Sequence, residues 1–243
     1  IITGSTNGGT DGFQPAQMNG CSMGSGPDLV YEVTPLSAGF LTAYIPSATA
    51  DFDSMMYFRS TCTDQASQLQ CNDNFNTPGN DGGEVLSIRV EAGVPVYLVV
   101  DGWNGASGTF DLSLDLSTGE DCTDPVPIVI EGDADIRARG NTTGTANDVS
   151  CNALFGQGPD VVYQITVDAT DGYLFDLTAP NHNSVLNART DCSSGLSEIG
   201  CDSPNMSNDS DLTLNLQANE TFFLWVDGTM GQEGPYFLFI NQL

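Results

Sequence analysis

The sequence contains no lysine, a single histidine and only 5 basic residues, all of them arginine, against 32 acidic residues. Its formal net charge is −27. A field this negative repels nucleic acid and anionic lipid, and it attracts cations and basic partners. The chain also has no apolar run that approaches the roughly 20 residues a membrane helix needs. We therefore expect no nucleic-acid partner and no membrane span.

Residues for nucleophilic or acid-base catalysis are equally scarce. The one histidine, His182, falls opposite Phe52 when the two halves of the chain are aligned on their cysteines. A catalytic base would not be replaced by phenylalanine in a repeated site, and no Ser-His-Asp or Cys-His set occurs in both halves. We expect no enzyme activity. The alternative is an acidic hydrolase that uses two of the many carboxylates.

An internal repeat organises the chain. GPDLVYEV at residues 26–33 returns as GPDVVYQI at residues 158–165. Three cysteines of the first half recur in the second with a constant shift of 130, namely Cys21, Cys62 and Cys71 as Cys151, Cys192 and Cys201. Agreement at many positions with few gaps indicates duplication. We expect two domains, residues 1–120 and 121–243, each of ordinary size for a single domain.

The apolar residues within each copy recur with period two. In EVLSIRVEA the side chains of Leu86, Ile88 and Val90 alternate with those of Ser87 and Arg89. This alternation is typical of a strand with one buried face. Similar short runs are separated by turns rich in Gly, Asn and Asp, and no long segment shows a helical stripe. The sequence predicts an all-β protein made of two tandem antiparallel β-sandwich domains, jelly-roll-like in type.

Several motifs taken together resemble the bacterial pre-peptidase C-terminal domain and its jelly-roll relatives in secreted proteins. In the first copy these are GPDLVYEV, DFDSMMYFRSTC, LSIRVEAGVPVYLVVDG and GTFDLSL, which cover most of the copy. The second copy offers GPDVVYQI, NHNSVLNARTDC and LTLNLQANETFFLWVDG. The resemblance implies a non-catalytic accessory module of a secreted protein, of a kind that sometimes binds calcium or an extracellular polymer such as collagen or polysaccharide.

The seven cysteines indicate disulfides and an oxidising, extracellular or cell-surface location. Cys62 and Cys71 bracket one polar loop, and Cys192 and Cys201 bracket another of equal length. Neither pair has a CxxC spacing or the nearby histidines of a zinc site, so both are expected in disulfides. Cys122 is expected to pair with Cys151 in the same way.

The second copy opens with a segment that the first copy lacks. EDCTDPVPIVIEGDADIRA contains PVPIVI, which is typical of an edge strand. Aligning TGST at residues 3–6 with TTGT at 142–145 places Ile1 close to Arg139 or Gly140, which leaves Cys21 unpaired or available to another molecule. Either such a strand precedes Ile1 in the full protein, or a neighbouring molecule supplies it, because an exposed sheet edge recruits strands.

The last strand of the second copy is apolar on both faces. YFLFI places Phe237 and Phe239 where the first copy has Asp111 and Ser113. The nearby FFLWV adds more aromatic surface. An apolar face of this size needs cover from a partner subunit, the sister domain or a glycan. The expected interface residues are Phe222, Trp225, Phe237 and Phe239.

Calcium is the candidate cofactor, because hard cations prefer several oxygen ligands. The candidate ligands lie on turns of the first copy, namely Asp51, Asp53, Asp73 and Asp81. The competing interpretation is that these side chains cap their own turns, which Asp and Asn do routinely. Four Asn-X-Ser/Thr sequons mark candidate glycosylation sites in the second copy, at Asn141, Asn205, Asn208 and Asn219.

These features favour a non-catalytic extracellular protein with a structural or adhesive role. The expected partner is another copy or a neighbouring subunit, joined through an edge strand to build a cell-surface or filamentous assembly. The alternative is a calcium-assisted module of a secreted hydrolase that binds collagen or polysaccharide.

Overall fold

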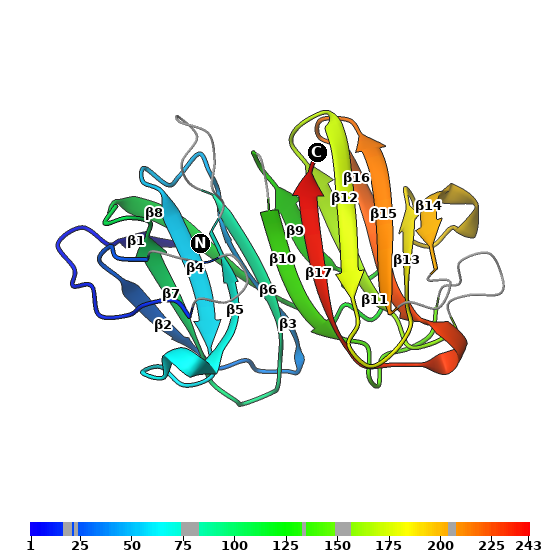
Figure 1. Cartoon of the computed structure of the whole chain (residues 1–243), viewed down its shortest axis with the longest axis horizontal. Helices are drawn as coiled ribbons and strands as arrows, with labels where there is room; N and C mark the ends of the chain where they lie inside the picture. Colours follow the sequence, from blue (N-terminus) through cyan, green and yellow to red (C-terminus); the bar gives the residue numbers. More distant parts are fainter. Residues whose placement is uncertain (17–20, 22–23, 74–82, 133–134, 149–156, 204–207) are drawn as a thin grey trace. The chain divides into compact units, whose positions relative to one another are not determined.

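The computed structural model describes residues 1–16, 21, 24–73, 83–132, 135–148, 157–203 and 208–243 (Figure 1). The chain divides into two compact units, which we call unit 1 (residues 1–116 and 131–137) and unit 2 (residues 117–130 and 138–243). Apart from three single-turn 3-10 helices, the regular elements of the described residues are all strands, as the sequence predicted. None of the described helices has the length and apolar character to cross a membrane.

Unit 1 contains two four-stranded layers, ordered β1-β8-β3-β6 and β2-β7-β4-β5. The pairs β1–β8, β3–β6, β2–β7, β4–β7 and β4–β5 are antiparallel. The elements are β1 (Ile2–Ser5), β2 (Leu29–Val33), β3 (Gly39–Ile45), β4 (Ser54–Arg59), η1 (Gln65–Ser67), β5 (Gln68–Asn72), β6 (Glu84–Val90), β7 (Val96–Gly102) and β8 (Thr109–Ser117).

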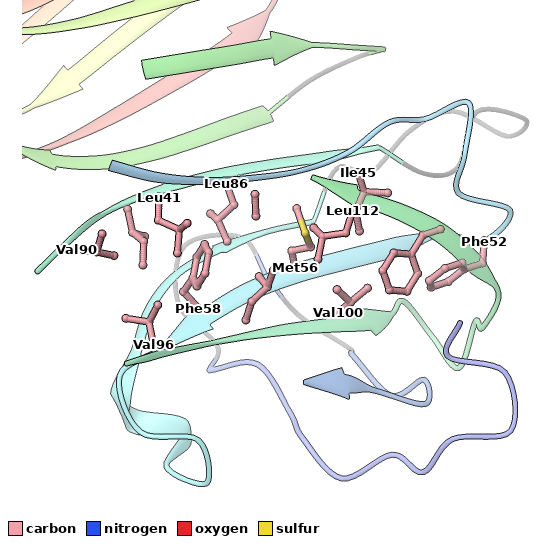
Figure 2. Close-up of a cluster of buried hydrophobic side chains, with 14 residues drawn as sticks. Leu41, Ile45, Phe52, Met56, Phe58, Leu86, Val90, Val96, Val100 and Leu112 are labelled. Atoms are coloured by element: carbon pink, nitrogen blue, oxygen red, sulfur yellow. The ribbon is translucent and has the colours of Figure 1, made fainter. Parts of the chain in front are cut away.

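The core of unit 1 forms where the alternating apolar residues of the two layers meet. Leu86 of β6 and Leu112 of β8 lie on one side, and Phe58 of β4 and Val100 of β7 lie on the other (Figure 2). All four side chains are buried in one apolar cluster. Removing apolar surface from water contributes about 25 cal/mol per Å², so this alternation is the main stabilising term of the sandwich.

Unit 2 repeats the arrangement and adds one strand. Its layers run β10-β17-β12-β15 and β14-β13-β16-β11-β9. The elements are β9 (Val126–Ile130), β10 (Asp135–Asn141), β11 (Val161–Val167), β12 (Asp171–Thr178), β13 (Ser184–Arg189), η2 (Gly195–Ser197), β14 (Glu198–Asp202), β15 (Asp209–Leu216), β16 (Thr221–Gly228), η3 (Thr229–Gly231) and β17 (Pro235–Gln242). The extra strand is β9, which lies within the predicted edge strand PVPIVI and is the last strand of its sheet.

Matching hydrogen bonds fix which residues of the two units correspond. Thr6 N donates to Gly108 O over 2.9 Å, and Thr142 N donates to Gly234 O over 3.0 Å. The hydroxyl oxygens of Thr6 and Thr142 accept from the same two glycines, each over 3.1 Å. Thr6 therefore corresponds to Thr142, which places Ile1 opposite Arg137. The sequence alignment to Arg139 or Gly140 was wrong because several Thr-Gly pairs in this segment offer similar matches.

The disulfide pairing differs from the prediction. Cys21 bonds to Cys71 with a Cα–Cα distance of 6.1 Å, and Cys62 is a free thiol, so the assignments of Cys21 as unpaired and of Cys62 to a disulfide were wrong. The reason is the β4–β5 ladder, which places Cys71 opposite Tyr57 instead of beside the turn that carries Cys62. The Cys71 side chain then packs with Cys21, Tyr57 and Val99.

The disulfide pairing of unit 2 also differs from the prediction. Cys122 bonds to Cys192 with a Cα–Cα distance of 5.7 Å, instead of to Cys151. Cys201 is also disulfide-bonded, but not to Cys192 as predicted. Cys151 lies outside the described residues. The Cys122–Cys192 bond ties the segment before β9 to the turn after β13.

Proteolytic mapping without reduction should show this connectivity. We expect linked peptides for Cys21–Cys71 and for Cys122–Cys192, and alkylation of Cys62 alone in the folded, unreduced chain. A peptide that joins Cys62 to Cys71 would contradict the structure. The peptides are identified by mass spectrometry. Alkylation of the free thiol and digestion at low pH suppress thiol-disulfide exchange, because the thiolate is the attacking species.

Candidate functional site: an open sheet edge

The two units differ most at one edge of the equivalent sheets. In unit 2, β11 pairs with β16 on one side and with β9 on the other. Its counterpart in unit 1, β2, pairs with β7 and is the last strand of its sheet within the described part of the chain. A last strand presents backbone N–H and C=O groups that a further strand can pair with. The β2 edge is our candidate functional site.

Nearly the same residues are covered in unit 2 and uncovered in unit 1. VVYQI and LVYEV share one alternation, and Val161, Tyr163 and Ile165 of β11 are completely buried. The corresponding Leu29, Val33 and Tyr31 pack against the core but remain partly exposed. β9 pairs with β11 from Tyr163 onward, so it adds cover at Tyr163 and Ile165 that Tyr31 and Val33 lack.

The covering strand shows what this edge accepts. β9 runs parallel to β11 and places Val126 opposite Tyr163 and Ile128 opposite Ile165. Val126, Ile128 and Ile130 are buried, whereas the residues between them are half-buried. Pro127 has no N–H, which suits an edge position because no outer strand needs that donor. A parallel strand with β-branched residues at every second position therefore fits this edge.

Beside the start of β2, unit 1 holds a pair of carboxyl groups, of which Asp101 is buried and Asp28 is half-buried. Asp28 Oδ2 accepts hydrogen bonds from Gly12 N (2.6 Å) and Phe13 N (2.8 Å), and Asp101 Oδ1 accepts from Gly102 N (2.7 Å). The other two oxygens, Asp28 Oδ1 and Asp101 Oδ2, are buried without an N–H donor. Burial raises the pKa of Asp101 to about 8, and the charge of Asp28 adds to this effect. The pair therefore holds a proton at neutral pH.

Unit 2 contains the same pair in Asp160 and Asp227. Asp148 N donates to Asp160 Oδ2 over 2.5 Å, and Gly158 N donates to Asp227 Oδ1 over 3.1 Å. Burial raises the pKa of Asp227 to about 9, with a further contribution from the charge of Asp160. The sequence places a Pro or Gly beside all four residues, at equivalent positions of the two copies. It did not show that the two carboxyl groups of each unit meet.

The predicted calcium ligands have other partners. Asp51 accepts from Thr109 N (2.6 Å) and Thr109 Oγ1 (2.9 Å), which lowers its pKa and makes it a turn cap. The backbone oxygen of Asp53 accepts from Trp103 N over 3.0 Å. Asp73 follows β5, and Asp81 lies outside the described residues. Within the described ranges, no group of three or more Asp, Glu, His or Cys could hold a metal ion.

Two of the four predicted interface residues belong to the core. Phe222 is completely buried and meets Phe175 edge-on at 5.5 Å, and Trp225 is 1% exposed. Their prediction as interface residues was wrong, because β16 is an inner strand of its sheet and both of its faces are covered. Phe237 and Phe239 of β17 are half-buried, and their place in an interface stays a prediction. Arg139 lies over the Phe237 ring at 5.4 Å.

The histidine and the sequons complete the comparison with the predictions. His182 is 4% exposed, and burial lowers its pKa. Its ring packs against Gly234, as Phe52 packs against Gly108, so the position fills space in both units. Asn208 and Asn219 are exposed and Asn141 is half-buried, whereas Asn205 lies outside the described residues. Glycosylation of these asparagines stays a prediction.

No protein-family model matches the sequence, and no curated protein matches it. Among solved structures, the pre-peptidase C-terminal domain of collagenase from Bacillus anthracis is similar over 48% of this chain and 94% of its own length, with 14% identity and a TM-score of 0.36. PliG, a periplasmic lysozyme inhibitor from Aeromonas hydrophila, matches over 49% and 96%, with 13% identity and a TM-score of 0.30. The CBM22 tandem domain of Paenibacillus barcinonensis Xyn10C matches over 89% and 82%, with 10% identity and a TM-score of 0.25. Similarities this low say nothing about function.

Proposed function

We propose that the protein is a non-catalytic extracellular structural protein that joins a neighbouring polypeptide by accepting a β-strand at the β2 edge of unit 1. The observation that carries this proposal is the contrast between equivalent strands. β11 is covered by β9, whereas β2 has a partner on one side only within the described residues. The disulfides support an extracellular location, because disulfides persist in oxidising compartments.

The occupant we propose is a strand with the chemistry of β9, contributed by another polypeptide. Main-chain hydrogen bonds to the edge give affinity in this mode of recognition, and pockets for alternate side chains give specificity. The partly exposed side chains of Tyr31 and Val33 correspond to Tyr163 and Ile165, which β9 pairs with, and they form the surface that such a strand would bury. The negative charge of the chain disfavours nonspecific association between copies, so pairing depends on this edge.

A synthetic peptide of residues 123–131 is the direct probe, because it contains β9 and no cysteine. We expect the fluorescently labelled peptide to bind the intact chain saturably by anisotropy. Hydrogen exchange should slow at residues 31–33 on binding, because these β2 residues correspond to the part of β11 that pairs with β9. The matched control peptide carries Ile128→Asp, which places a charge at the most central buried position of β9.

Two results would refute the proposal. One is equal binding by the wild-type and Ile128→Asp peptides, since a strand that docks in register must bury that side chain. The other is an absence of binding at peptide concentrations up to the millimolar range. Protection that appears in unit 2 instead of at β2 counts against it as well, because β9 already covers the β11 edge there.

A further inference from the structure

The free cysteine of unit 1 lies where unit 2 forms its bond to the covering strand. Cys62 sits on the turn after β4, and the repeat matches it to Cys192 on the turn after β13. Cys192 is bonded to Cys122. Three residues lie between Cys122 and Val126, the first residue of β9. In unit 2 the segment that covers the edge is thus held twice, by strand pairing and by a disulfide.

The two turns have the same geometry. Ser60 N donates to Ser67 O over 3.1 Å, and Thr190 N donates to Ser197 O over 3.1 Å. The hydroxyl of Ser67 donates to Thr61 O over 2.9 Å, as that of Ser197 does to Asp191 O over 2.8 Å. Each turn also leads into a single-turn helix and then a strand, η1 and β5 or η2 and β14. The position and direction of Cys62 relative to its sheet therefore match those of Cys192.

Cys62 is more exposed than Cys192, as expected for a cysteine without a disulfide partner. Cys192 is 6% exposed and packs with Cys122, Val162 and Trp225. Cys62 remains partly exposed and carries no disulfide. The Arg59 guanidinium donates to Cys62 O over 3.1 Å, which fixes the turn independently of any partner. Cys62 lies on the turn between β4 and β5, two strands away from the β2 edge, as Cys192 lies on the turn between β13 and β14, two strands away from β11. The residues that precede a strand docked on β2 would therefore reach Cys62 by crossing the sheet, as those between β9 and Cys122 do in unit 2.

We propose that Cys62 forms an interchain disulfide with the strand that docks on β2. This inference rests on the proposed function and adds the covalent bond and its sequence requirement. The accepted strand carries its cysteine four residues before the first of three alternating β-branched residues, which is the pattern Cys-x-x-x-Val-x-Ile-x-Ile of residues 122–130. Docking in the register of β9 on β11 would bring the two Cα atoms to a distance near the 5.7 Å of Cys122 and Cys192, within the usual disulfide range.

The bond forms by thiol-disulfide exchange with a strand whose cysteine is held as a mixed disulfide with a small thiol such as glutathione. Cys62 loses its proton, and its thiolate attacks the Sγ atom of the incoming cysteine. The new S–S bond forms while the bond to the small thiol breaks, and the departing thiolate takes up a proton. The Cys62 sulfur is oxidised and the small thiol is reduced, so no further oxidant is needed.

The test uses the intact chain and a peptide of residues 120–131 whose Cys122 is a mixed disulfide with glutathione. We expect a one-to-one adduct, detected by nonreducing mass spectrometry and mapped to Cys62, with release of one glutathione. Because docking raises the effective concentration of the two sulfurs, the adduct should form at least tenfold faster than with the Ile128→Asp peptide. The Cys62→Ser chain should give no adduct.

A register control separates directed from random coupling. A peptide with Cys122→Ser and Asp124→Cys keeps the strand but moves the thiol two residues closer to it, and it should couple at the slow rate of the Ile128→Asp peptide. Equal rates for all three cysteine peptides would overturn the inference, because Cys62 would then be an ordinary exposed thiol. Binding of the cysteine-free peptide without coupling of the Cys122 peptide would overturn it while leaving the proposed function intact. Absence of both binding and coupling would refute the proposed function itself.

Discussion

Replacing Asp101 with Asn should make unit 1 more stable above pH 8 and leave its stability near pH 4 almost unchanged. Asn keeps the oxygen that accepts from Gly102 N, and its amide can donate to Asp28 Oδ1 without needing a bound proton. The same reasoning applies to Asp227→Asn in unit 2, where the Asp227 carboxyl accepts from Gly158 N. The variants therefore mimic the protonated state of each pair permanently.

The sign follows from the raised pKa values. Asp101 has a pKa of about 8 and Asp227 of about 9 in the folded chain, against an ordinary value of 3.8. The folded state then binds more protons than the unfolded state above about pH 4, so the stabilising contribution is complete below that pH. It declines as pH rises towards 8 to 9, because unfolding releases the proton. One pKa unit corresponds to about 1.4 kcal/mol, so we expect a difference on the order of a few kcal/mol, or roughly 10 °C in melting temperature.

The measurement is thermal unfolding of the wild-type chain, Asp101→Asn and Asp227→Asn between pH 4 and pH 9, in EDTA to remove divalent cations. The control is Asp51→Asn, because Asp51 is an exposed cap with a lowered pKa and should give no gain at alkaline pH. A constant difference between the wild type and Asp101→Asn at all pH values would contradict the proton-sharing pair. A loss of stability at pH 9 would contradict it as well.

The architecture was predictable because the relevant signals are local in sequence. The alternation of Leu86, Ile88 and Val90 matches β6, and all three side chains are buried. PVPIVI was predicted to form an edge strand that the first copy lacks, and β9 confirms it. Period-two burial and Gly-rich turns depend on nearest neighbours along the chain, so one sequence suffices to read them.

The pairing of cysteines and the contents of the site were not predictable in the same way. Cys62 and Cys71 are close in sequence, but the β4–β5 ladder and the approach of Cys21 decide which sulfur atoms meet. Phe222 and Trp225 looked like an exposed aromatic surface because FFLWV does not reveal that β16 is central in its sheet. The meeting of Asp28 with Asp101 depends on residues far apart in sequence. The sequence signal for this pair was the duplication, because Asp28 and Asp101 both recur in unit 2.

These corrections strengthen the prediction about the edge. If Cys21 were the unpaired cysteine, as the sequence predicted, the missing strand and the unpaired cysteine would belong to different parts of the fold. The structure assigns the free thiol to Cys62, whose counterpart Cys192 is bonded to the segment that precedes β9. Within the described residues, the open β2 edge and the free Cys62 thiol of unit 1 therefore correspond to two places in unit 2 that one segment, residues 122–130, covers and bonds.

Joining residues 121–136 directly in front of Ile1 should stabilise unit 1. Ile1 corresponds to Arg137 through the matched hydrogen bonds of Thr6 and Thr142, so this join reproduces the spacing between β9 and the following strand. The added strand can pair with β2 and cover Tyr31 and Val33, as β9 covers Tyr163 and Ile165. The added copy carries Cys122→Ser, so that it cannot form a disulfide with Cys62. We expect the free energy of unfolding of unit 1 to rise by about 2 kcal/mol. The melting temperature should rise by roughly 4 °C for each kcal/mol in a unit of this size.

Hydrogen exchange with mass spectrometry resolves this effect, because peptides from unit 2 act as an internal control in the same molecule. Protection should rise in β2 and β7 of unit 1 and stay constant in β11 and β16, which β9 already supports. The joined chain should also lose its affinity for the peptide of residues 123–131, since the edge is then occupied. The same addition carrying Ile128→Asp should give neither effect. A joined chain that still binds the peptide with unchanged affinity would show that the edge accepting it is not β2.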